Sequence, residues 1–171
     1  MTDADVVLVT YSTRPRGGVV HTLALAEALQ AAGTLVHVLA LGDPTAGFYR
    51  PVAAPVTIVP GPAGDRTLEE KVAGSIDRLT VALAGFDTSL LHAQDCIAAR
   101  ASARVRDDGA NVTVVRTVHH VDDFTSQILM DCQRAAILEP DVVLAVSQAW
   151  RLTLEQDYGV GARVVDRKSV V

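Results

Sequence analysis

The sequence has few cysteines and no long apolar run. Its two cysteines, Cys96 and Cys132, lie far apart, so neither a zinc motif nor a disulfide framework is expected. We expect each to be a small buried apolar group. No apolar run approaches the roughly 18 residues that a membrane-spanning helix needs. The acidic start, Met1 to Asp5, lacks the basic region of a signal peptide, so we expect a cytoplasmic protein with no membrane span.

Positive charge and familiar catalytic motifs are also scarce. The net charge is -5 and the only lysines are Lys71 and Lys168, so no basic face for nucleic acid or anionic lipid is expected. The preference for arginine and alanine is typical of a GC-rich bacterium. The absence of G-x-G-x-x-G and of G-x-x-x-x-G-K-[ST] argues against a nicotinamide dehydrogenase and a P-loop nucleotidase. There is no serine nucleophile elbow, H-E-x-x-H or CxxC.

Short apolar runs, rich in valine, alternate with segments of helical period. With 171 residues, 49% of them apolar, the chain fits one domain or half of a larger two-domain protein. The runs predict strands of a parallel sheet covered on both faces. They lie at 6–9, 35–41, 56–59, 89–91, 112–115 and 142–146, with a further short strand beginning at 161–165. The alternation predicts an α/β fold, a doubly wound, mainly parallel, Rossmann-like sheet with helices on both faces.

Capping residues bound the helices expected between these strands. A capping box starts at Thr67, while Asp95 and Ser147 are candidate N-caps and Gly33 is a stop signal. In the second helix the residues on one face step by three and four: Leu68, Val72, Ile76, Leu79 and Leu83. The expected helices are 17–32, 67–86, 95–108, 126–138 and 147–158.

Two segments fall outside this alternation. Residues 42–62 hold five prolines and three glycines, and they are either a connector or a mobile loop over the site. The last six residues, 166–171, leave the arginine-only pattern and match what a common sequencing adapter encodes in one frame. We therefore expect 166–171 to be a non-native tail on a truncated reading frame. Resequencing the locus tests this, and a native stop codon there would contradict it.

Polar residues follow three of the predicted strands, where ligands of open parallel sheets bind. After the first strand, Arg16, Gly17 and Gly18 open a helix whose free amides suit a phosphate or a sugar oxygen, or they form a tight turn without a ligand. After the fourth strand, His92 is a pocket residue or a satisfied strand-end histidine, and Asp95 caps a helix.

The fifth strand ends in the most polar stretch of the sequence, which contains His119, His120, Asp122 and Asp123. Adjacent side chains of an extended chain point to opposite sides, so only one of the two histidines should face the cleft. The stretch is a pocket wall, an exposed loop or, least favoured, a metal site, because its spacing matches no known ligand pattern.

In this order, these segments resemble the N-terminal half of a family 4 glycosyltransferase of GT-B architecture. The resemblance covers nearly the whole chain to about residue 165. It rests on Arg16-Gly17-Gly18 before a helix that ends in Ala28-Leu29-Gln30-Ala31-Ala32-Gly33, and on Val36-His37-Val38-Leu39, Leu91-His92-Ala93, Thr117-Val118-His119 and Val146-Ser147. The stretch from Val115 to Phe124 is similar to a subgroup of bacterial members.

The resemblance implies a retaining transfer of a sugar from a nucleotide-sugar donor to an acceptor small molecule, with no bound metal or other cofactor. It places Gly17 and Gly18 near the donor phosphates and His119 at the reaction centre. Arg16, His92, His120 and Asp123 are possible pocket residues. We expect the C-terminal donor-binding domain of the family to be missing from this chain, and the domain at 1–165 to be inactive alone. The alternatives are a GT-B-like nucleotide-sugar epimerase and a non-catalytic α/β binding module.

Overall fold

The computed structural model describes residues 1–160 and 164–166. Residues 167–171 of the expected tail lie outside the described residues, and Asp166 belongs to the last strand. The helices are α1 (Gly17–Ala31), α2 (Leu68–Leu83), α3 (Cys96–Asp107), α4 (Gln127–Leu138) and α5 (Gln148–Tyr158). The strands are β1 (Thr2–Asp3), β2 (Val6–Thr10), β3 (Val36–Leu41), β4 (Val56–Val59), β5 (Phe86–Asp87), β6 (Leu90–Ala93), β7 (Thr113–Val118), β8 (Val142–Ala145) and β9 (Val164–Asp166).

Seven of the strands form one sheet in the order β4-β3-β2-β6-β7-β8-β9, and each neighbouring pair is parallel. The chain first builds outward from β2 through β3 to β4, then returns to the other side of β2 and builds outward from β6. The strand order therefore reverses between β2 and β6, which lie side by side. In such sheets this reversal is where ligands bind, at the carboxyl ends of the strands.

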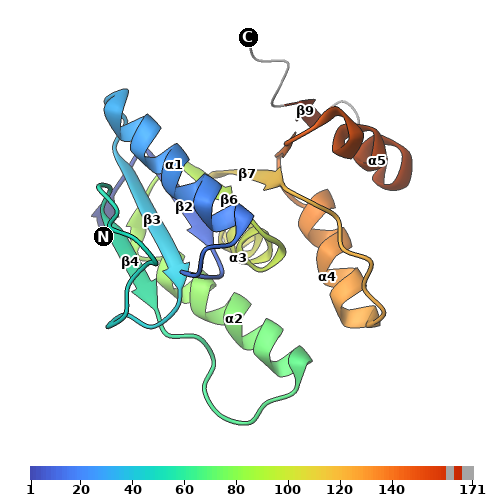
Figure 1. Ribbon diagram of the computed structural model, residues 1–171, viewed down its shortest axis with the longest axis horizontal. Coiled ribbons are helices and arrows are strands. Elements are labelled where there is room, and N and C mark those ends of the chain that lie inside the picture. The colour runs from blue at the N-terminus through green and yellow to red at the C-terminus, as the bar shows by residue number, and fades with distance from the viewer. Residues whose placement is uncertain (161–163, 167–171) are drawn as a thin grey trace.

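Helices cover both faces of the sheet, as predicted. Leu8 and Val38 pack on Leu23 and Ala26 of α1, while the next residues along their strands point to the opposite face. That face packs on α2, α3 and α4. Figure 1 shows α1 over β2 and β3, with α4 and α5 at the opposite end of the sheet from β4.

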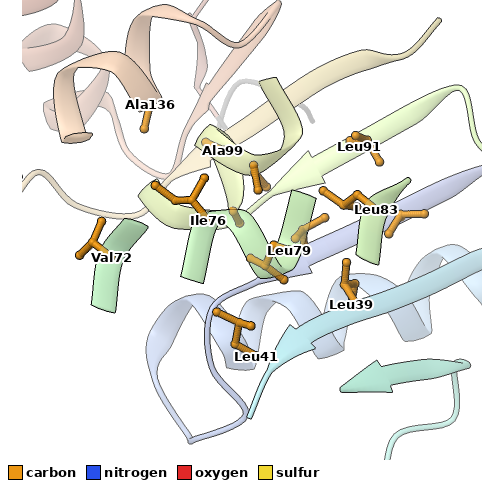
Figure 2. Packing of buried hydrophobic residues seen from close by; sticks show 14 of the residues in the cluster. Leu39, Leu41, Val72, Ile76, Leu79, Leu83, Leu91, Ala99 and Ala136 are labelled. Atoms are coloured by element: carbon orange, nitrogen blue, oxygen red, sulfur yellow. The ribbon is translucent and has the colours of Figure 1, made fainter. Parts of the chain in front are cut away.

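The larger core cluster contains most of the predicted apolar face of α2. Val72, Ile76, Leu79 and Leu83 are buried with residues of β2, β3, β6 and α3, as Figure 2 shows. Leu68, the first residue of the helix, is 50% exposed, so the buried part of this face begins at Val72. The predicted capping box is present: Thr67 Oγ1 accepts from the Glu70 amide, and the Glu70 carboxylate accepts from the Thr67 amide.

The largest differences from the predicted elements are at strand ends. β7 continues to Val118, beyond the predicted end at 115, because Arg116 and Thr117 are extended and only 3% exposed despite their polarity. The helix predicted to reach 86 ends at Leu83, and Phe86 pairs with Thr2 in a small separate sheet. Two-residue strands such as β1 and β5 are too short to show a period.

Cys96 and Cys132 are free, half-buried and packed against the larger core cluster. Burial raises the pKa of both thiols. Among the described residues, no helix is both long and apolar enough to cross a bilayer.

Candidate functional site

The glycine turn at the start of α1 lies at the carboxyl end of β2. Arg16 is the N-cap residue in an extended conformation, and its side chain makes no capping hydrogen bond to the first amides of the helix. Gly17 is exposed, and a Cβ there would meet nothing within 4 Å. A Cβ on Gly18 would lie 3.5 Å from Cδ2 of His119 and 3.6 Å from the carbonyl oxygen of Gln94. Only the second glycine therefore makes a close approach to other strands.

His119 follows β7 and lies between the glycine turn after β2 and the residues that follow β6. Its Nε2 is 3.0 Å from Oε1 of Gln94, which follows β6. Its ring packs edge-on against His21 of α1, with centroids 5.1 Å apart. Three strand exits that are far apart in the sequence, after β2, β6 and β7, thus meet around one imidazole at the reversal of strand order.

His92 lies in β6, within the sheet, two residues before Gln94. We call Gly18, His21, Gln94 and His119 the histidine cluster, or the cluster for short. His92 is 8% exposed, and its Nε2 is 2.8 Å from the hydroxyl of Thr117. Burial, together with the nearby His21, lowers the pKa of His92 to about 4, so the side chain is neutral near pH 7. Its position suits a packing partner of the site more than a group open to a ligand.

His120 and Asp123 lie away from the cluster. His120 is exposed and pairs with Asp122 at 3.2 Å, and Asp123 is also exposed. The expectation that one histidine of the pair faces the site and the other turns away agrees with this arrangement. Gln133 of α4 fixes the segment, because its amide both donates to the Asp122 carbonyl and accepts from the Asp122 amide.

Asp95 joins two of the converging loops. Its carboxylate accepts from the amide of Ala98, as the predicted N-cap of α3, and from the amide of Tyr11 after β2, each at 2.8 Å. Burial raises the pKa of Asp95, and these two hydrogen bonds partly offset that rise. Arg16 is exposed and donates to the hydroxyl of Tyr11 at 2.5 Å, so the glycine turn is tied to the same loop.

A hollow of about 600 Å³ lies at the ends of β2 and β3, and its described lining does not include Gly18, Gln94 or His119. The loop after β2 forms one wall, and part of the proline-rich segment 42–62 forms another. Its lining includes the rings of Tyr11, Phe48 and Tyr49 and the charged side chains of Arg14 and Asp43. Aromatic faces beside hydroxyls and charges form a surface suited to a polar ring-shaped ligand.

Sequence reasoning missed His21 and Gln94 as members of the cluster. Both had a detectable signal. His21 is three residues after Gly18 and so shares its helix face, and Gln94 is two residues after His92 and so points to the same side of the strand. Within the described residues, no group of three or more histidine, cysteine or acidic side chains is arranged to hold a metal ion.

The sequence matches the profile of Glycosyltransferase Family 4 over residues 15–166. A comparison with curated proteins finds no match. Solved structures with the same fold include HepE from Anabaena in complex with UDP and glucose, at 16% identity and a TM-score of 0.67 over 95% of this chain and 44% of that one. The catalytic domain of starch synthase IV from Arabidopsis thaliana, bound to ADP and acarbose, matches at 14% identity and 0.69 over 96% and 51%.

A third similar structure is the UDP-GlcNAc 2-epimerase from Neisseria meningitidis bound to UDP-GlcNAc, at 12% identity and a TM-score of 0.68 over 94% of this chain and 46% of that one. The chain thus spans about half the length of these proteins. At such identities the structures establish the fold alone, and that fold agrees with the predicted N-terminal GT-B domain. The family is established by the profile match over most of the sequence: this chain belongs to Glycosyltransferase Family 4.

Proposed function

We propose that this chain is the acceptor-side half of a retaining glycosyltransferase, which moves a sugar from a nucleotide-sugar donor to an acceptor small molecule. The observation that carries the proposal is the meeting of Gly18, Gln94 and His119 at the reversal of strand order. The family membership supports it, as do the nucleotides bound in the structures of similar fold. The proposal retains the cytoplasmic location expected from the sequence.

In this proposal the start of α1 faces the leaving group. Departure of a nucleoside diphosphate develops negative charge, which the free amides at Gly17 and Gly18 and the helix dipole can stabilise without a bound metal. Arg16 adds a positive charge at the same turn. His119 lies within van der Waals reach of that turn and would hydrogen-bond the reacting sugar or orient the acceptor.

The hollow at the ends of β2 and β3 would receive the acceptor. It opens next to the loop that holds Arg16, so an acceptor seated there would reach toward the glycine turn. Since the chain spans about half of the similar structures, we propose that turnover requires a second, donor-binding unit and that this chain alone is inactive.

Saturation-transfer NMR with UDP-glucose, ADP-glucose and UDP-GlcNAc tests the proposal. We expect weak binding with saturation of sugar protons, and a loss of that sugar signal in H119Q. H120Q is the matched control, because His120 is exposed and pairs with Asp122. Equal loss in both variants would contradict the assignment of His119. Binding of none of the three donors would contradict the proposed contact of this half with the donor.

A turnover assay on the isolated chain separates the alternatives. Transfer of a sugar to added acceptors by the chain alone would refute the requirement for a second unit. Conversion of UDP-GlcNAc into its 2-epimer would instead favour the epimerase. Tight binding of a ligand other than a nucleotide sugar would favour a non-catalytic binding module.

A further inference from the structure

Gln94 connects the parts of the cluster. It follows β6 directly and is 3% exposed. Its backbone amide donates to the carbonyl of Val9 at 3.0 Å, which continues the pairing of β6 with β2. Its own carbonyl faces Gly18, and its side-chain Oε1 lies 3.0 Å from Nε2 of His119. One residue thus contacts both the glycine turn and the histidine.

Part of the Gln94 side chain destabilises the folded state. Its Nε2 is buried and has no hydrogen-bond partner among the described residues. A buried donor without a partner costs roughly 1–3 kcal/mol, a cost that an apolar side chain of similar size avoids. The hydrogen bond to His119 is therefore the feature that distinguishes a glutamine here from a methionine.

We infer that Gln94 is a positioning residue for His119, an inference whose catalytic meaning rests on the proposed function. Oε1 can only accept, so the imidazole carries its proton on Nε2 and donates it to Gln94. The Cδ2–Nε2 edge of the ring faces the glycine turn, because Cδ2 and Nε2 are the ring atoms within 4 Å of a Cβ on Gly18. The amide thereby fixes both the tautomer and the orientation of the ring before any substrate binds.

NMR of the chain labelled with ¹⁵N at histidine tests this directly. The His119 imidazole is partly buried and hydrogen-bonded to the buried Gln94 side chain, which slows exchange of its N–H, so we expect a one-bond ¹H–¹⁵N signal from Nε2 at neutral pH. The H119Q variant identifies the signal by its disappearance. In Q94M the signal should be lost, while thermal stability stays equal or rises because the unpartnered amide is gone. In Q94E, whose carboxylate also accepts, the signal should persist and move downfield.

Retention of the signal in Q94M, or an unprotonated Nε2 in the wild-type chain, would overturn the inference. If Q94M does not fold, the wild-type and Q94E spectra still decide, because loss of the signal in Q94E also contradicts an acceptor at this position. The readout does not involve sugar transfer. An intact signal in a chain that binds no nucleotide sugar therefore contradicts the proposed function alone, whereas a missing signal contradicts the positioning alone.

Discussion

Replacing Gly18 by valine should create a steric clash with His119 and Gln94, the two residues that a Cβ at this position would contact. A Cβ at this position would lie 3.5 Å from Cδ2 of His119, an ordinary van der Waals contact, so alanine fits. Valine adds two methyl groups about 1.5 Å further out. A methyl directed at the ring would come within roughly 2 Å of it, far inside the ~3.5–4.0 Å contact distance. The Gln94 carbonyl oxygen, 3.6 Å from the same Cβ, is a second atom that the two methyl groups must avoid.

We expect G18V to lose about 1–3 kcal/mol of unfolding free energy, the usual cost of overpacking. For a chain of this size that lowers Tm by about 2–4 °C per kcal/mol. The same change should displace His119, which is visible as a shift of its ring signals by NMR. G18A should be neutral, and G17V is the matched control because nothing lies within 4 Å of that position. If G18V and G17V lower Tm equally and leave the His119 signals in place, the convergence argument is refuted.

Three further predictions concern the support of the site. The folded-state pKa of His92 is about 4, below its unfolded value of about 6.5, so the unfolding free energy should fall by up to about 3 kcal/mol as pH drops from 6.5 to 4. Urea denaturation at several pH values measures this. H92Q should flatten the pH dependence, and H120Q should not. D95A leaves two amides without their acceptor and should cost about 2–3 kcal/mol by urea denaturation; a loss below about 0.5 kcal/mol would contradict the bridging role of Asp95. A Cβ on Gly42 would lie 2.7 Å from Cγ2 of Thr13, so G42A should lose about 1–3 kcal/mol of unfolding free energy. The double variant G42A/T13A should recover most of that loss. Additive losses in the double variant would show that this contact is not the cause.

Much of the fold could be predicted because its signals are local. The capping box at Thr67 and the N-cap at Asp95 depend on residues within three positions, and both are present. Valine-rich strands between helices require parallel pairing, and the seven-stranded sheet is parallel throughout. Where the prediction failed, a neighbour distant in the sequence decided the outcome: Arg116 and Thr117 continue β7 because the strands beside them supply hydrogen-bond partners.

The candidate site divides in the same way. The sequence indicated Gly18 and His119 as residues at strand exits, since polar residues after apolar runs can be recognised locally. It did not indicate that His21 and Gln94 contact that histidine, because each contact joins segments about 25 to 100 residues apart.

The amino-acid sequence by itself indicated the strands of the seven-stranded sheet, the five helices, most of their caps and the family. The tertiary structure decided what surrounds each of the two adjacent histidines: His119 lies against Gly18 and Gln94, and His120 is exposed beside Asp122. The physical reason is that secondary structure follows from neighbours along the chain, whereas a site forms where the sheet brings separate strand ends together.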